Sequence, residues 1–209
     1  MFLIGIAGGS GSGKTTFAKK IMQRVDHREV VLLHQDSYYL PMPPTEHRVH
    51  GEPNFDHPEA FDWPLLLDHL TRLKAGEQVA TPVYDYKVSR RLPETELIGP
   101  CKTILLEGIY ALWHPAIRGL FDIKMYLHVD ADIRFIRRLH RDVRERGRTL
   151  DSIIRQYYDT VRPMHHEFLE TTQQYADMVV GEETDVAADV MAARIRQLLQ
   201  NSSAEDTFF

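Results

Sequence analysis

The chain has 209 residues, 43% of them hydrophobic, and a net charge of -5. This length and composition suffice for one domain with a sizeable core. The acidic balance argues against nucleic acid or a membrane as a partner. The single cysteine, Cys101, excludes an internal disulfide framework and suits a reducing compartment, so we expect a cytoplasmic protein.

The chain begins with an apolar run, Leu3–Ala7, that is too short to span a membrane and lacks the basic start of a signal peptide. It is typical of a buried strand. The glycine-rich loop that follows fits the phosphate-binding pattern GxxxxGK[ST], and a helical pattern covers Phe17–Val25. Glycines aim backbone N–H groups at phosphate oxygens, while Lys14 adds a positive charge and Thr15 a hydroxyl ligand for Mg²⁺. We therefore expect a nucleoside triphosphate to bind Gly8, Gly9, Ser10, Gly11, Ser12, Gly13, Lys14, Thr15 and Thr16.

The next apolar run, Val30–His34, predicts a strand, and Asp36 follows its carboxyl end. Ligands of parallel sheets gather at this edge. Asp36 is our first choice for a general base that takes a proton from an acceptor hydroxyl, and it can also bind the metal shell. The alternative is that Asp36 only caps the following turn.

Residues 38–61 are rich in proline and show no periodicity, which is typical of a lid or a substrate wall. Neither His47 and His50 nor the neighbours His165 and His166 have zinc-site spacing, so we expect these histidines to be solvated or incidental. A helix is predicted over Pro64–Lys74, before Gly76.

The region 76–99 is predicted to be an inserted β-hairpin, because Thr81–Leu92 contains a short strand, a turn and a basic exit. Aromatic rings and carboxylates alternate here and in the preceding proline-rich segment. Such rings can stack on a planar base and such carboxylates can hold ribose hydroxyls, although half of them are equally consistent with core packing. The residues concerned are Tyr38, Tyr39, Phe55, Asp56, Tyr84, Asp85 and Tyr86.

A third strand, Thr103–Leu106, ends at Glu107, where a Walker-B carboxylate holds Mg²⁺ or its waters. A surface turn is the alternative. A strand over Ile123–Val129 then precedes a helix over Ile133–Glu145.

Arginines are dense between Asp132 and Leu150, and we expect residues 137–150 to form a lid. Arginine binds oxyanions through its planar fork, so at least two of these side chains should contact phosphate or ribose. Several others are expected to form a solvated face, with Asp142 and Glu145 as ion-pair partners. The six within residues 137–150 are Arg137, Arg138, Arg141, Arg144, Arg146 and Arg148.

The remaining elements are a helix over Leu150–Val161 that stops at Pro163, a strand over Met178–Val180 and a helix over Val186–Leu199. The whole pattern predicts an α/β fold of the P-loop NTPase kind, with helices flanking a parallel sheet. We expect one kinase domain over residues 1–200 and a disordered tail over 201–209.

The order of these motifs resembles the uridine-cytidine kinases, a family within the P-loop kinase and phosphoribulokinase-like group. Besides the phosphate loop, the resemblance rests on Gln35–Tyr39, Asn54–Pro58, Pro82–Tyr86, Leu106–Ile109 and Glu145–Arg148, and it runs from about Phe2 to Val180. It implies that ATP or GTP phosphorylates the 5′-hydroxyl of uridine or cytidine in pyrimidine salvage. It also implies a homotetramer and inhibition by CTP or UTP.

The resemblance assigns roles to individual residues. Asp36 would be the base, Thr15, Asp36 and Glu107 would surround Mg²⁺, and Lys14, Arg141 and Arg146 would face the triphosphate. For the nucleoside, Asp56, Arg138 and Gln156 would hold the ribose hydroxyls, Phe55 and Tyr86 would sandwich the base, Tyr84 and Arg148 would read its edge, and Tyr39 would line the pocket.

Two positions depart from the family pattern. Ser89 stands where the family has a base-reading histidine, which leaves the choice between uridine and cytidine open. The run Val180–Glu183 replaces Pro-Arg-Gly, which leaves the donor base open.

The alternatives are a related kinase acting on ribulose 5-phosphate, pantothenate or another alcohol, and a nucleotide-dependent switch. A phosphorylated sugar needs a second anion site, for which Arg90 and Arg91 are the candidates. The sequence has no Asn-Lys-x-Asp guanine motif, which weighs against a GTPase switch.

Overall fold

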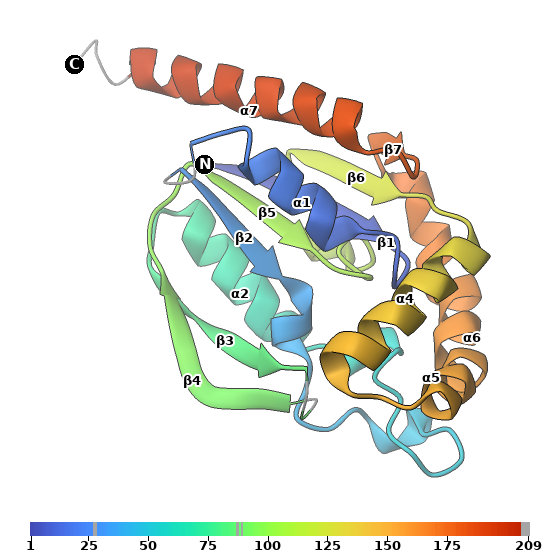
Figure 1. Cartoon of the computed structure of the whole chain (residues 1–209). Helices are drawn as coiled ribbons and strands as arrows, with labels where there is room; N and C mark the ends of the chain where they lie inside the picture. Colours follow the sequence, from blue (N-terminus) through green and yellow to red (C-terminus); the bar gives the residue numbers. More distant parts are fainter. Residues whose placement is uncertain (27–28, 87, 89, 206–209) are drawn as a thin grey trace.

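Five parallel strands form the central sheet, in the order β2-β5-β1-β6-β7 (Figure 1). The computed structural model describes residues 1–26, 29–86, 88 and 90–205. The strands are β1 (Phe2–Gly8), β2 (Val30–His34), β5 (Thr103–Glu107), β6 (Ile123–Leu127) and β7 (Met178–Val180). Each coincides with an expected strand to within two residues, and the predicted α/β class with a parallel sheet is confirmed.

Helices cover both faces of this sheet, with α1 (Lys14–Met22) and α7 (Asp185–Glu205) on one side and α2 (Trp63–Lys74) on the other (Figure 1). Successive residues of β1 point to opposite faces, as the pleat requires. Leu3 therefore packs in the cluster that contains α2, and Ile4 packs in the cluster that contains α1 and α7. Both side chains are fully buried.

The expected hairpin is present outside the main sheet, as an antiparallel pair of β3 (Val79–Asp85) and β4 (Arg90–Ile98). Val79 and Ile98 pair at its base and are buried in the same cluster as α2. The far end of the hairpin therefore projects beside the carboxyl edge of the main sheet, where Tyr86 reaches Asp36.

Short helical segments make up the connections. The chain contains 3-10 turns at η1 (Gln35–Tyr38), η2 (Thr45–His47) and η3 (Pro58–Ala60), and a short helix α3 (Pro115–Arg118). The longer helix α4 (Ala131–Arg146) carries the arginines and ends at Gly147, whose φ of 65° is the left-handed conformation of a helix C-cap.

The predicted stop at Pro163 is wrong, because helical chain runs from Leu150 to Tyr175. It passes through α5 (Leu150–Gln156), a π-helical turn η4 (Tyr157–Val161), α6 (Arg162–Met164), a second π-helical turn η5 (His165–Leu169) and the 3-10 segment η6 (Glu170–Tyr175). Pro163 lies in the first turn of α6, directly after a π turn. Its missing N–H is tolerated in a first turn.

Residues 201–205 continue α7, so this helix extends into the segment that we expected to form a disordered tail. No glycine or proline interrupts this stretch, so the helical hydrogen bonds can continue. Residues 206–209 lie outside the described part of the chain. None of the described helices is long and apolar enough to cross a membrane.

Candidate active site

The glycine-rich loop turns tightly between β1 and α1. Gly11 and Gly13 have φ of 83° and 92°, a conformation that side chains other than glycine rarely adopt. A Cβ at Gly11 would lie 2.2 Å from the carbonyl oxygen of Arg134. The loop therefore passes against α4 at a distance that only glycine permits, and Lys14 is buried with its ammonium donating to the Gly9 carbonyl at 3.1 Å.

Glu107 lies at the end of β5, next to the start of α1. Its Oε1 accepts a hydrogen bond from the Thr15 hydroxyl at 2.7 Å and lies 2.7 Å from Nδ1 of His34. Burial alone raises the pKa of Glu107, but the His34 hydrogen bond and the charge of Lys14 outweigh it, so the net shift is downward. The carboxylate is therefore held ionised.

Asp36 follows β2 within η1 and has the opposite electrostatic environment. Burial and then the charge of Glu107 raise the pKa of Asp36, against the charge of Lys14 and a 3.1 Å hydrogen bond from the Tyr86 hydroxyl. Burial also lowers the pKa of Lys14. Two neighbouring carboxylates with opposite shifts suit two different tasks, an anionic ligand and a more basic proton acceptor.

Thr15, Asp36 and Glu107 fit Mg²⁺ as a group. They present a hydroxyl and two carboxylates, the hard oxygen donors that Mg²⁺ prefers, and it retains several waters beside one or two carboxylates. The charge of Glu107 raises the pKa of Asp36, so the two carboxylates repel each other. A bound divalent cation would relieve this repulsion.

A cleft of about 1460 Å³ opens from these residues toward the hairpin and α4. Most of the predicted side chains line it, although they come from segments far apart in the sequence. They are Ser10, Lys14, Thr15, Thr16, Asp36, Tyr39, Phe55, Asp56, Tyr84, Tyr86, Glu107, Arg138, Arg141, Arg146, Arg148 and Gln156. Ser89 lies outside the described residues.

One end of the cleft holds a hydrogen-bonded network around Asp56. Its Oδ2 accepts from the Gln156 amide at 2.9 Å and from the Thr160 hydroxyl at 2.7 Å. Arg138 donates both to the Gln156 amide oxygen at 2.9 Å and to the Ser10 hydroxyl at 3.0 Å. The network thus runs from the phosphate loop to a polar pocket with fixed donors and acceptors.

Aromatic rings form one wall of the cleft. Tyr39 contacts Tyr84 and Phe55, with centroids 5.5 and 5.8 Å apart, and stacks on the buried Phe61 at 4.2 Å. The Arg146 guanidinium lies 4.5 Å from the centre of the Tyr86 ring. Tyr39 is therefore partly a core residue, and one face of Tyr86 is covered by a cation.

The six arginines divide between the cleft and the surface of the molecule. Arg138, Arg141, Arg146 and Arg148 line the cleft. Arg137 instead pairs with Glu182, and Arg144 is exposed. All four cleft arginines contact the buried Asp142.

Three residues that take part in the hydrogen bonds of this site were not predicted from the sequence. His34 was not assigned to the site, although its position two residues before Asp36 places it at the same sheet edge. Thr160 follows Gln156 by four residues, and this helical spacing was a usable signal. Tyr110, whose buried hydroxyl donates to the Asp56 carbonyl at 2.8 Å, gave no such signal.

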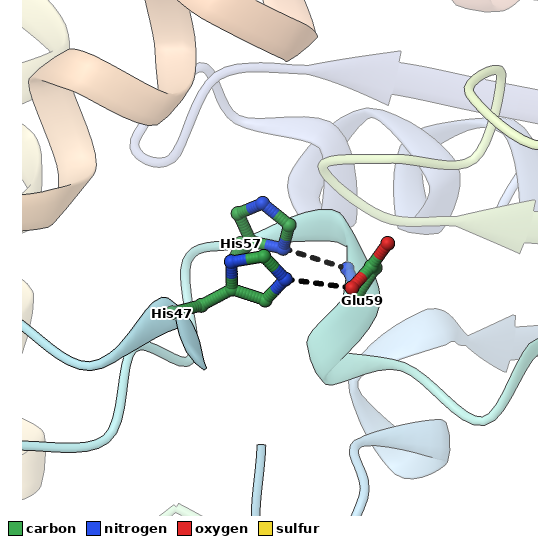
Figure 2. A group of neighbouring side chains, drawn as sticks. All are labelled: His47, His57 and Glu59. Atoms are coloured by element: carbon green, nitrogen blue, oxygen red, sulfur yellow. Dashed lines mark hydrogen bonds and ion pairs between the residues drawn. The ribbon is translucent and has the colours of Figure 1, made fainter. Parts of the chain in front are cut away.

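A second group of polar side chains lies in the proline-rich segment, where His47, His57 and Glu59 bring three potential metal ligands within 4.8 Å (Figure 2). The imidazoles stack with centroids 3.6 Å apart. His57 Nδ1 accepts the Glu59 N–H at 3.2 Å, which uses its one lone pair, and His47 Nε2 lies 2.6 Å from the Glu59 carboxylate. These contacts fasten η2 to η3 beside Asp56, so His47 is a structural residue rather than an incidental one.

His165 predicts a pH dependence of stability. It lies 3.2 Å from the Arg134 guanidinium, and burial followed by the charge of Arg134 lowers its pKa to about 4. Between pH 6.5 and 4, His165 is therefore protonated in the unfolded chain but neutral in the folded one. The free energy of unfolding falls as the pH falls through this range. We expect a loss on the order of 1 to 2 kcal/mol between pH 7 and 5.

Urea unfolding of the parent and of His165→Gln at both pH values measures this loss. Glutamine retains a hydrogen-bond acceptor for Arg134 but does not titrate, so the variant should lose less stability on acidification. Equal losses in the two proteins would contradict the assignment.

Known proteins resemble this chain over nearly its whole length. The model of the "Phosphoribulokinase / Uridine kinase family" matches residues 3–188. The uridine kinase of Clostridium tetani is 46% identical over 202 residues, which covers 96% of this chain and 97% of that protein. The uridine kinase of Halalkalibacterium halodurans is 46% identical over 203 residues, with 96% of each chain covered.

Solved structures share the fold at lower identity. The phosphoribulokinase from Rhodobacter spheroides superposes with a TM-score of 0.63 at 17% identity, covering 86% of this chain and 69% of that one. D-glycerate 3-kinase from Cryptococcus neoformans superposes with a TM-score of 0.62 at 15% identity, covering 87% of this chain and 86% of that one. The family match, the close relatives and the phosphate loop facing Asp36 and Glu107 agree with the resemblance drawn from the sequence motifs: the chain is a kinase of the phosphoribulokinase and uridine kinase family.

Proposed function

We propose that this kinase transfers the γ-phosphoryl group of ATP or GTP to the 5′-hydroxyl of a pyrimidine ribonucleoside, uridine or cytidine, and so serves pyrimidine salvage. The observation that carries the proposal is the cleft with two unlike ends. Phosphate-binding groups and Asp36 lie at one end, and the Asp56 network and the aromatic wall lie at the other. The relatives named uridine kinase support the same acceptor class.

In this proposal Asp36 accepts the proton of the attacking hydroxyl. Its raised pKa makes it a better base than an exposed aspartate, and it points into the cleft beside Lys14. Lys14, Arg141 and Arg146 neutralise the charge that develops on the transferring group. Thr15, Asp36 and Glu107 would hold Mg²⁺, which would supply neutralisation of the triphosphate charge. The backbone N–H groups of Gly8–Thr16 hold the donor in place.

The Asp56 network is proposed to bind the ribose. A carboxylate and an amide, Asp56 and Gln156, can accept from and donate to the 2′- and 3′-hydroxyls, with Arg138 fixing the amide. In this proposal Phe55 and Tyr86 sandwich the base, and Tyr84 and Arg148 contact its edge. Tyr39, which contacts Phe55 and Tyr84, lines the pocket. Because Arg146 lies over one face of the Tyr86 ring, the base would stack on the opposite face.

The rival acceptors differ in charge. Ribulose 5-phosphate needs a second anion site, but Arg91 is engaged by Asp62 at 3.2 Å and is not among the described residues that line the cleft. A neutral nucleoside needs no such site, so the geometry favours it. A coupled assay of Mg-ATP consumption with uridine, cytidine, purine nucleosides, ribulose 5-phosphate and pantothenate tests the proposal. Turnover restricted to the last two, or hydrolysis indifferent to every acceptor, would overturn it.

Position 89 is proposed to affect the choice of base. Because the family has a histidine here, Ser89→His is expected to raise the uridine-to-cytidine ratio of kcat/KM by roughly tenfold, the value of one hydrogen bond to a substrate edge. Parallel kinetics with both nucleosides measure the ratio. An unchanged ratio would remove position 89 from base recognition.

The proposal leaves the donor open between ATP and GTP, and it includes a tetramer that is inhibited by CTP or UTP. Glu182, in the run that departs from the family pattern, pairs with Arg137 on α4, so this arginine is engaged by an acid rather than free for a donor base. Rates with ATP and GTP decide the donor. Native mass and inhibition by CTP or UTP test the proposed tetramer and feedback.

A further inference from the structure

Asp142 is the most enclosed acid near the cleft. Its side chain is fully buried on α4, one helical turn after Arg138 and one before Arg146. Sequence reasoning expected it only to pair with surface arginines. In the structure it is surrounded by four of them, and each of the four lines the cleft.

The two carboxylate oxygens of Asp142 serve different arginines. Oδ1 lies 2.9 Å from Arg141 and 3.4 Å from Arg146, the pair proposed to face the triphosphate. Oδ2 lies 3.6 Å from Arg138 and 3.5 Å from Arg148, the pair that holds the Gln156 amide. One carboxylate thus contacts both ends of the cleft.

The backbone around Asp142 supports this arrangement. Gly147 ends α4 in the left-handed conformation, so the chain reverses and the Arg148 N–H donates to the Asp142 carbonyl at 3.1 Å. The reversal returns Arg148 to the carboxylate although it lies beyond the helix. The four positively charged guanidinium groups around Asp142 repel one another. The negative charge of the buried carboxylate offsets this repulsion.

We propose that Asp142 is the positioning residue of the arginine cluster, which sets the phosphate-side and nucleoside-side arginines through its two oxygens and so couples the two ends of the cleft. A ligand that moves Arg141 and Arg146 toward the phosphates weakens their ion pairs with Oδ1. The carboxylate is then free to interact more strongly with Arg138 and Arg148 through Oδ2. Such coupling is reciprocal: nucleoside tightens nucleotide binding by the same factor as nucleotide tightens nucleoside binding. The inference rests on the proposed function for the identity of the second ligand.

Asp142→Asn tests the proposal, because asparagine keeps the size of the side chain and removes its charge. Binding of Mg-bound β,γ-imido-ATP is measured by calorimetry, with and without the nucleoside that the parent phosphorylates. We expect the nucleoside to tighten nucleotide binding roughly fivefold or more in the parent and less than twofold in the variant. A parent without coupling, or a variant that retains it, would overturn the proposal.

Asp132→Asn is the matched control. It removes the same charge from the same helix, at an exposed position in the first turn of α4, and should retain the parent's coupling. If no nucleoside is turned over, the proposed function fails separately. Binding of β,γ-imido-ATP in the absence of nucleoside then still tests the proposal. Asp142→Asn should weaken this binding, because Arg141 and Arg146 lose the carboxylate that positions them. Undiminished binding would contradict the role of Asp142.

If Asp142→Asn does not fold, a double-mutant cycle replaces it. Arg141→Gln and Arg148→Gln alter two partly exposed side chains on opposite oxygens of Asp142. Their effects on kcat/KM should be non-additive if the carboxylate links them, and independent sites would give additive effects. Additivity would overturn the coupling.

Discussion

Replacing Asp36 with asparagine is expected to lower kcat by roughly 10²-fold or more, while the affinity for the Mg-bound nucleotide changes little. Asparagine retains the size of the side chain and can still accept the Tyr86 hydroxyl, which lies 3.1 Å from Asp36 Oδ2. It cannot accept a proton from an attacking hydroxyl. Steady-state kinetics with the best acceptor and calorimetry with a non-hydrolysable nucleotide separate the two effects.

Asp68→Asn serves as the control for Asp36→Asn. Asp68 is an exposed residue of α2 that pairs with Arg72 at 3.5 Å, and this change should leave kcat unaltered. If Asp36→Asn turned over like the parent, Asp36 would not be the base. If it lost nucleotide binding to the same extent as turnover, its role would be in metal binding rather than in proton transfer.

Lys14→Met is expected to reduce kcat/KM for the nucleotide by roughly 10²- to 10³-fold, which is typical for removal of one preorganised cationic donor. The Lys14 side chain is buried and lines the cleft. Methionine fills a similar volume without a charge, so Asp36 and Glu107 lose a neighbouring cation and the phosphates lose a donor. Kinetics at varied nucleotide concentration measure the loss.

Lys20→Met is the comparison for Lys14→Met. Lys20 lies on the same helix, but it pairs with Asp185 at 2.8 Å on the surface, where an ion pair contributes about 0–1 kcal/mol. Its loss should leave catalysis intact. A Lys14→Met protein with parental kcat/KM would show that the loop binds phosphate through its backbone alone.

The sequence was sufficient for the fold because the signals were local. The short apolar runs Val30–His34 and Met178–Val180 coincide with two of the strands. The glycine-rich loop lies between a strand and a helix, as its motif predicts. The error at Pro163 arose because a proline inside a regular helix ends it, whereas here a π turn precedes the proline and places it in the first turn of α6.

The site was predictable only in part. Motif residues such as Asp36 and Glu107 follow strands and had to meet at one edge. Asp142 looked like an ordinary surface acid, because nothing in the local pattern shows that Gly147 returns Arg148 to it. Contacts that depend on chain reversal, or on segments a hundred residues apart such as Asp56 and Thr160, require the folded structure.

The position of α4 limits how the enzyme can move. Near its start, the backbone of Arg134 rests against Gly11 so closely that no side chain fits between them, and near its end the same helix carries Arg141 and Arg146 over the cleft. This contact blocks any movement of the first turns of α4 toward the phosphate loop. If the arginines of α4 move when a ligand binds, the helix would have to bend beyond Arg134.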